Sequence, residues 1–384
     1  MEKQSNDAGK PKKQHSAPAR NWVGDNGKII EPLFADYFLS LHPMRCFQGR
    51  LFTVDGMVED EAPLKKEIYE QIRYYATTSV ARRIEHIVQA IKLACASEPP
   101  EIQTDRIHVR NGTYFVDGHF TPEKEYCMNR LPIAYVPDAP APTRWLQFLN
   151  ELLYEEDIPA LQEYIGYCLL PVTKAQKMLL MVGKGGEGKS RIGLILRELF
   201  GSSMYTGSLQ KVETNRFARA DLEYKLLLVD DDMKTEALPQ TNNIKTLVTL
   251  EDKIDIERKG QQSVQGTLYV RFACFGNGSL HALYDKSNGF YRRQLLLTTK
   301  EKPVGRVDDP FLIDKMRNEK EGILLWALEG LHRLIQNNYQ FTISERTAAN
   351  LKEAMEQGNN ILGFLKSEGY FEIRQGAKCK STDF

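Results

Sequence analysis

The sequence predicts an α/β protein with a central parallel sheet. Apolar residues fill two short segments, 178–182 and 226–229, without the alternation that a half-exposed strand would show. Such continuous runs are typical of parallel strands that are buried on both faces. Segments with helical spacing lie between the predicted strands, and this alternation is the pattern of a parallel α/β sheet. A ligand site is then expected at the carboxyl ends of the strands.

Length and composition suit a globular protein with more than one domain. The chain has 384 residues, 42% hydrophobic and 27% charged, which is ordinary for two or three domains. Its 51 basic residues balance 51 acidic ones, so contact with nucleic acid would need a local basic patch. The six cysteines are scattered, so we expect free thiols in a reducing cytosol rather than zinc ligands or disulfides.

The sequence contains no recognisable membrane span or secretory signal. No apolar run reaches the length of a membrane span, and the polar N-terminus lacks the apolar stretch of a signal peptide. We therefore expect a cytoplasmic protein with no membrane partner. Residues 1–20 are rich in lysine and nearly free of apolar residues. They should form a disordered basic tail, either solvated or in contact with nucleic acid.

Residues 21–142 are expected to form a mixed α+β domain. The predicted elements are helices over 31–41, 63–75 and 79–96, two short strands within 46–58, and a β-hairpin over 107–120. The hairpin is predicted around Asn111-Gly112, a pair typical of type I′ turns. The proline-rich stretch 137–142 predicts the linker that ends this domain.

Residues 143–340 carry the predicted parallel sheet, and residues 341–384 should form a C-terminal helical segment. The predicted strands lie over 177–182, 226–229, 254–259, 267–275 and 294–299. The predicted helices lie over 145–170 (two helices), 191–200, 217–222, 243–250, 312–316, 321–334, 344–356 and 361–365. Strands 254–259 and 267–272 are expected to pair as a hairpin.

The loop after the first strand, residues 183–190, fits the phosphate-binding pattern G-x-x-x-x-G-K-[ST]. Glycines let the backbone turn its N–H groups toward an anion, and the following helix adds its positive N-terminal end. Lys189 would reach the β- and γ-phosphates of ATP, and Ser190 would bind Mg²⁺. The alternative is a chance match, against which the flanking strand and helix argue. The predicted nucleotide-binding residues are Gly183, Lys184, Gly185, Gly186, Glu187, Gly188, Lys189, Ser190 and Arg191.

Acidic residues follow the apolar run 226–229. Asp230 and Asp231 are expected at the same sheet edge as the glycine-rich loop, where one carboxylate would hold the Mg²⁺ of ATP and another would polarise the attacking water. We favour Asp230 for the metal and Asp231 for the water, although the roles of these two residues and of Asp232 stay open. The alternative is a solvated acidic turn.

Two further polar positions come later in the chain. Asn277 follows the strand that ends near residue 275, where an amide could orient water and contact the γ-phosphate. Arg292 and Arg293 precede the last strand, and either guanidinium could reach a phosphate in a neighbouring subunit as an arginine finger. The alternatives are an ordinary Asn-Gly turn and ordinary surface arginines.

The tip of the hairpin expected after residue 254 is basic and polar. Arg258 and Lys259 precede Gly260 there, at an exposed position that ATP chemistry does not require. A contact with the phosphate backbone of a nucleic acid is one interpretation, and a merely solvated tip is the other.

Taken together, these segments resemble superfamily 3 helicases, specifically the phage and plasmid primase-helicase family that is related to the poxvirus primase-helicase. The segments that carry the resemblance are 166–177, the loop 183–190, 216–222, 225–231, 244–246, 257–260, 275–277 and 289–293. The resemblance runs from about residue 31 to residue 365, and it is most specific in the ATP-site motifs.

The resemblance implies an AAA+-type ATPase that assembles as a hexameric ring, with each ATP site completed by an arginine of the neighbouring subunit. The hairpin tip would face the central channel and pull single-stranded DNA, with Lys259 the first candidate for this contact and Arg258 the second. The implied activity is ATP-dependent unwinding of forked DNA during replication of a phage, plasmid or genomic island. Asp230-Asp231 replaces the Asp-Glu pair common in AAA+ proteins.

Longer members of the family carry a primase, for which too little sequence precedes residue 31. We therefore expect a helicase without primer synthesis that works with a separate primase or initiator, and the winged-helix module should be absent or truncated. A second hypothesis is an initiator or loader that melts DNA without processive unwinding, and a third is an ATP-dependent remodeller of proteins. A helix-turn-helix, which we do not find, would favour the second. The basic hairpin tip argues against the third.

Overall fold

The computed structural model describes residues 21–76, 78–233, 241–249, 253–278 and 287–358. By its internal contacts the chain divides into two compact units, Met1–Pro100 and Glu101–Phe384. The predicted basic tail and the predicted helix over 361–365 lie outside the described residues, as does the C-terminal segment beyond residue 358.

The first unit is built from helices and a small antiparallel sheet. Its helices are α1 (Glu31–Leu41), α2 (Ala62–Ile72) and α3 (Val80–Ala94), and its strands are β1 (Arg45–Phe47), β2 (Arg50–Thr53) and β3 (Gly56–Met57). Trp22 is buried in its core and meets Phe34 edge to face, with ring centroids 4.9 Å apart. The three predicted helices and the predicted strand pair are confirmed, and β3 adds a third short strand.

The predicted hairpin is confirmed as β4 (Arg106–Val109) and β5 (Gly112–Phe115), to which β6 (Phe120–Thr121) adds an antiparallel edge. The predicted turn is wrong by one residue. Val109 pairs with Gly112, so the two loop residues are Arg110 and Asn111. A type I′ turn needs positive φ at both, and neither Arg110 nor Asn111 has it. Asn111 instead exchanges two hydrogen bonds with the backbone of Tyr135.

The hairpin packs with the second unit, although its segment was predicted to belong to the N-terminal domain. Val109 and Tyr114 lie in the same hydrophobic core as Trp145, beyond the predicted boundary at residue 142. The Tyr114 hydroxyl lies 3.1 Å from His332 Nε2, and Tyr269 donates to Asn129 at 2.6 Å. These long-range contacts explain why the division of the chain falls at Pro100 instead. The local composition of residues 137–142 indicated a linker, but it carries no information on contacts with distant segments of the chain.

The second unit contains a five-stranded sheet with all neighbouring strands parallel, which confirms the predicted parallel sheet. The strand over Met204–Thr206 was not predicted, and the predicted strand that begins at residue 254 lies outside this sheet. The strand order in the sheet is β13-β7-β12-β9-β8. The strands are β7 (Met178–Gly183), β8 (Met204–Thr206), β9 (Leu227–Asp230), β12 (Arg271–Asn277) and β13 (Gln294–Thr298). Because β12 lies between β7 and β9, the ends of these three strands are neighbours at one edge.

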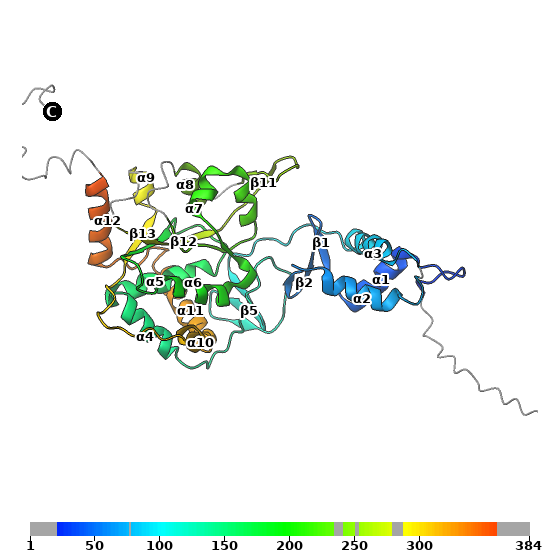
Figure 1. The fold of residues 1–384 in the computed structure, drawn as a ribbon, viewed down its shortest axis with the longest axis horizontal. Helices are drawn as coiled ribbons and strands as arrows, with labels where there is room; N and C mark the ends of the chain where they lie inside the picture. Colours follow the sequence, from blue (N-terminus) through cyan, green and yellow to red (C-terminus); the bar gives the residue numbers. More distant parts are fainter. Residues whose placement is uncertain (1–20, 77, 234–240, 250–252, 279–286, 359–384) are drawn as a thin grey trace, which may run out of the picture. The chain divides into compact units, whose positions relative to one another are not determined.

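Helices cover both faces of the sheet, as Figure 1 shows. One face packs against α4 (Thr143–Leu152), α5 (Ile158–Cys168), α6 (Lys189–Phe200), α10 (Leu312–Arg317) and α11 (Lys320–Gln336). The other packs against α7 (Leu209–Thr214), α8 (Asn242–Val248), α9 (Asn288–Tyr291) and α12 (Glu345–Gly358). We call these the α6 face and the α7 face. Side chains alternate between them: in β9, Val229 is in the α6-face core and Leu228 in the α7-face core.

A second, separate hairpin extends from this unit beside α7 and α8 (Figure 1). It pairs β10 (Ile254–Ile256) with β11 (Val264–Gly266). The predicted hairpin is therefore right in its first strand and wrong in the partner of that strand, which is β11 and not residues 267–272. The predicted strand over 267–275 is confirmed from residue 271 onward as β12, whereas residues 267–270 belong to neither β11 nor β12. Leu268, Tyr269 and Val270 are all buried, so the apolar alternation that suggested a half-exposed strand does not reflect their exposure.

Most of the remaining elements agree with the prediction, although helix α7 was not predicted. Residues 216–222 form a short 3-10 helix (Arg216–Leu222), and α10, α11 and α12 correspond to the predicted C-terminal helices within one or two residues at most ends. Within the described part of the chain, no helix is long and apolar enough to cross a bilayer. Five cysteines are free thiols, and the sixth, Cys379, lies outside the described residues.

Candidate functional site

The glycine-rich loop connects β7 to α6, as the sequence predicts. Gly185, Gly186 and Gly188 have φ values of +111°, +80° and +118°, which side chains with a Cβ rarely adopt. Helix α6 begins at Lys189, directly after the loop. The loop therefore directs its N–H groups and the positive end of α6 toward a common concave side.

Gly183 needs to be glycine because other groups crowd above it. A Cβ there would lie 2.2 Å from Thr299 Oγ1, 2.8 Å from Lys189 Nζ and 2.9 Å from Glu187 Oε1. The Lys189 ammonium is thus folded back over the start of the loop, where a phosphate group would be expected. Its side chain is only 6% exposed.

Glu187 occupies the concave side of the loop together with Lys189. Lys189 Nζ donates to Glu187 Oε2 at 2.8 Å, and the backbone N–H of Gly185 donates to Glu187 Oε1 at 2.7 Å. Burial alone would raise the pKa of Glu187, but the hydrogen bonds from Lys189 and the backbone outweigh it and lower this pKa. A charged carboxylate therefore already lies in a loop that is predicted to bind an anion.

The other predicted loop residues face outward. Ser190 is exposed at the first turn of α6, and Arg191 beside it is half-buried. Lys184 pairs with Glu301 at 2.6 Å, and both side chains are more than 70% exposed. The Lys184 side chain is thus directed to solvent, while its neighbours at 183 and 185 line the inside of the loop.

Asn277 lies beside the glycine-rich loop although 94 residues of sequence separate it from Gly183. The two residues pair in register at the ends of β12 and β7, and Gly278 N donates to Gly183 O at 3.0 Å. Asn277 Oδ1 lies 3.7 Å from the position of a Cβ on Gly185. Tertiary structure therefore brings the predicted polar residue to the loop.

The acidic residues after β9 separate into two environments. Asp230 is 7% exposed, and its Oδ2 accepts the Leu209 N–H at 2.7 Å, at the start of α7. Its carboxylate therefore points to the α7 face, opposite the helix that follows the glycine-rich loop. Burial raises the pKa of Asp230. Asp231 and Asp232 are exposed.

Arg292 and Arg293 lie at the opposite end of the sheet from the loop. Gln294, which follows them, pairs with Met178 at the start of β7, whereas the loop begins at Gly183. Five residues of strand span about 16 Å. The two arginines also differ from each other. Arg293 donates to Gly289 O, and burial lowers its pKa, whereas the Arg292 side chain is exposed.

The hairpin tip also divides the predicted pair of basic residues. Arg258 forms an ion pair with Glu223, which is itself 7% exposed, so its guanidinium is anchored to the body of the unit. Lys259 is exposed, and Gly260 follows it with φ of +75°. Residues 259–263 are all exposed. Of the predicted pair, only Lys259 has its side chain directed to solvent.

Two features beside the loop were not predicted. Arg306 Nη1 donates to the carbonyl oxygen of Glu187 at 3.1 Å, and its Nη2 pairs with Asp308 at 3.2 Å. An open pocket also borders the loop, where the Arg346 guanidinium lies 3.3 Å from the centroid of the Tyr154 ring. The residues of both features come from segments that are distant in the chain, so no local sequence pattern indicated them.

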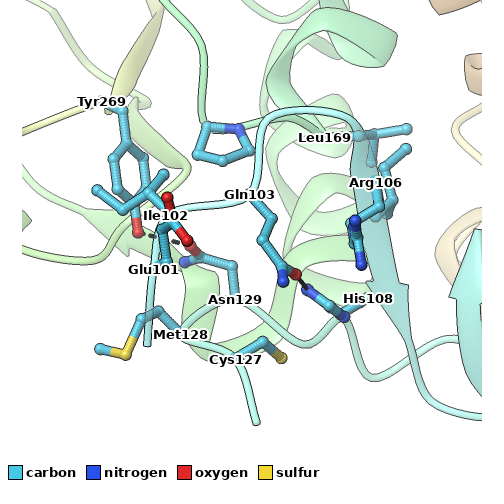
Figure 2. A pocket seen from close by; sticks show the side chains of 12 residues that line it. Glu101, Ile102, Gln103, Arg106, His108, Cys127, Met128, Asn129, Leu169 and Tyr269 are labelled. Carbon is cyan, nitrogen blue, oxygen red and sulfur yellow. Dashed lines mark hydrogen bonds between the residues drawn. The ribbon is translucent and has the colours of Figure 1, made fainter. Parts of the chain in front are cut away.

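A second pocket is lined by side chains from residues 101–108 and 127–129 and by Tyr269 (Figure 2). His108 Nε2 lies 2.9 Å from Gln103 Oε1, and the Tyr269 hydroxyl bonds Asn129. Burial, with a contribution from Arg130, lowers the pKa of His108 to about 4, so the ring is neutral at pH 7. These polar groups satisfy one another, and we assign them a structural role.

Two family descriptions match parts of the chain. Residues 32–153 match a domain described as D5 N terminal like, and residues 181–293 match a family of unknown function (DUF5906). A D5 N-terminal-like domain is typical of phage and plasmid primase-helicase proteins. No curated protein matches the chain.

The solved structures that resemble the chain support the fold. One apo structure of the NrS-1 C-terminal region (305–718) has a TM-score of 0.55 and 13% identity, covering 84% of this chain and 75% of the other. The A form apo structure of the same region has a TM-score of 0.52 and 13% identity, covering 84% and 74%. At this identity the likeness extends to the arrangement of the elements alone.

Proposed function

We propose that this protein is an AAA+-type ATPase of superfamily 3 that uses ATP to unwind DNA. The observation that carries the proposal is the strand order β13-β7-β12-β9-β8. It gathers the glycine-rich loop, Asn277 and the acidic residues 230–232 at one edge of the sheet, as a shared site for ATP would need. The D5 N-terminal-like match supports a role in replication of a phage, plasmid or related mobile genetic element.

In this proposal the loop binds the phosphates of ATP through backbone N–H groups and Lys189. Among the residues that the structure describes, no three His, Cys, Asp or Glu side chains cluster as a protein-only metal site would require. Mg²⁺ fits all the same, because it takes one or two protein ligands together with phosphate oxygens and water. Exposed Ser190 and an exposed aspartate would hold it there, and when bound it neutralises charge on the phosphates.

The geometry favours Asp231 over Asp230 as the metal ligand. The Asp230 carboxylate is buried and bonded to the Leu209 N–H on the α7 face, while Asp231 is exposed at the end of β9. Asn277 would orient the attacking water or contact the γ-phosphate from its position beside Gly185. Tyr154 and Arg346 in the adjoining pocket offer a ring and a guanidinium against which the base of ATP would stack.

The proposal places the arginine finger in a neighbouring copy of the chain. Arg292 is exposed and lies about one strand length from the loop of its own chain, so it would serve the loop of another. A ring of such copies, which we propose to be a hexamer, would direct the hairpin tips inward. Lys259 would then contact the phosphates of single-stranded DNA, and Arg258 would brace the hairpin through Glu223.

The experiment measures ATP hydrolysis with and without single-stranded DNA, and strand displacement on a forked substrate. Wild type should show DNA-stimulated hydrolysis and unwinding, and Lys189→Ala should lose both by at least about 100-fold, the scale for a charged group that contacts the transition state. ATPase activity indifferent to any nucleic acid would count against a helicase. Duplex binding without stimulation by single strands would favour an initiator or loader.

A further inference from the structure

The carboxylate of Glu187 lies where a bound anion is expected. It accepts the N–H of Gly185 at 2.7 Å and the ammonium of Lys189 at 2.8 Å. Both partners belong to the set that should bind phosphate, and the Glu187 side chain is 3% exposed. The loop thus binds an anion that is part of its own sequence.

The Gly185 N–H cannot serve the carboxylate and a phosphate at the same time, whereas the Lys189 ammonium has three N–H donors and could be shared between them. The single N–H of Gly185 is directed at Glu187 Oε1, and Lys189 Nζ lies over Gly183 between Glu187 and Thr299. A phosphate that took both contacts would have to take the place of the carboxylate. The lowered pKa of Glu187 means that the competing group is charged at neutral pH.

We propose that Glu187 is an internal competitor of the nucleotide, whose carboxylate must leave the Gly185 N–H, and give up or share Lys189, before the phosphates of ATP can bind there. This inference rests on the proposed ATPase function. It assigns to Glu187 a role opposite to that of its neighbours in the loop, because Glu187 lowers the affinity for nucleotide while it holds Lys189 in position.

Two features explain how the carboxylate could leave without disturbing the loop. Arg306 donates to the backbone carbonyl of Glu187 at 3.1 Å, so the main chain of Glu187 is held in place from outside the loop. Residues 185, 186 and 188, which flank it, are glycines with positive φ and have no side chains that would block its path. Rotation of the Glu187 side chain alone would therefore open the site.

Glu301 offers a matched control. It also borders the pocket beside the loop, and it also pairs with a loop lysine, Lys184, at 2.6 Å. Both members of that pair are highly exposed, and neither contacts the Gly185 N–H or Lys189. Glu301→Gln removes one negative charge near the nucleotide without removing the competitor, so it measures the general electrostatic effect of such a change.

The experiment measures the dissociation constant of Mg·ATP for the full chain by calorimetry. We expect Glu187→Gln to bind about tenfold tighter than wild type, on the scale of one hydrogen bond to a charged group. Glu301→Gln should stay within about twofold. If Glu187 only positions Lys189, Glu187→Gln would instead bind more weakly, and unchanged or weaker binding overturns the proposal.

Thermal melting separates competition from damage to the fold. Without nucleotide, Glu187→Gln should melt below wild type, because buried Lys189 loses its charged partner. With saturating ATP its melting temperature should rise by more than that of wild type, since tighter binding stabilises the folded state further. An equal or smaller rise contradicts the inference. If neither wild type nor Glu187→Gln binds ATP, the proposed function itself fails.

Discussion

The two ends of the five-stranded sheet carry different kinds of groups. At the carboxyl ends of β7, β12 and β9 lie the glycine-rich loop, Asn277 and the acidic residues that follow Val229. At the amino end of β13 lies the arginine pair. In the proposed site, the backbone at the first end would bind an anion and its oxygen atoms would bind a metal, while the second end presents one exposed guanidinium.

The distance between these ends decides how they could work together. Gln294, two residues after Arg292, pairs with Met178, and the loop begins five residues further along β7, about 16 Å away. No side chain spans that distance, so Arg292 could stabilise charge on ATP only at the loop of another copy. We therefore expect an ATP site composed of residues from two copies of the chain. The following experiments test it in order of expected effect.

Removal of Arg292 should have the largest effect. Because an arginine finger contributes about 10³–10⁵ in rate, Arg292→Ala should lower kcat for ATP hydrolysis by about 10³-fold or more, with smaller change in ATP affinity. Steady-state ATPase assays measure both.

A mixing experiment then tests whether this arginine acts between copies. Equal amounts of Arg292→Ala and Lys189→Ala chains should recover part of the activity, since some interfaces would combine an intact loop with an intact arginine. Mixtures as inactive as the separate variants would show that Arg292 does not act on the loop of another copy.

Asp231 tests the other end of the sheet. Asp231→Asn should lower ATP hydrolysis by about 100-fold, the scale for one group that acts on developing charge, while the melting temperature stays unchanged because the side chain is exposed. Activity and melting are measured on the same preparation. Normal ATP hydrolysis by Asp231→Asn would contradict Asp231 as the metal ligand and favour Asp230 instead.

Lys259 should have a smaller effect that is confined to DNA. Lys259→Ala should weaken binding of single-stranded DNA several-fold and reduce the slope of log affinity against log salt by about 0.7, the value for one phosphate contact. Fluorescence anisotropy at several salt concentrations measures both. Lys352→Ala, an exposed lysine on α12, is the control, and equal slopes for the two variants would contradict the contact. Arg258→Ala should instead lower the melting temperature, because Glu223 is buried.

Asp230 should give the smallest effect, on stability. Burial raises its pKa above the ordinary value of about 3.9. Between that value and the raised one the folded state holds more protons than the unfolded state, so stability falls as pH rises through this window. Asp230→Asn keeps an oxygen for the Leu209 N–H without the buried charge. It should melt slightly above wild type at pH 7 and lack this pH dependence, which melting curves from pH 4 to 8 measure. A lower melting temperature at pH 7 would contradict burial as the cause of the raised pKa.

Local patterns predicted most elements of the fold. The strand, loop and helix around residues 183–190 were placed correctly, because glycines and a helix start act over a few residues. The errors came where partners are distant. The hairpin 106–115 joined the second unit through contacts with residues far along the chain, and Ile254–Ile256 pairs with Val264–Gly266 instead of with residues 267–272.

The candidate site shows the same limit at the level of single residues. In each predicted pair the two adjacent residues have similar chemistry but lie in different environments. The pairs are Asp230 and Asp231, Arg258 and Lys259, and Arg292 and Arg293. Arg306 and the Tyr154–Arg346 contact were missed, because their partners lie more than 100 residues away.

The sequence alone determined that a glycine-rich loop joins a buried strand to a helix, since this requires only residues that are neighbours in the chain. The strand order that brings Asn277 to Gly183, and the sheet face to which each side chain turns, were decided by tertiary structure. The physical reason is that packing and hydrogen bonding between distant segments select among conformations that the local sequence allows equally.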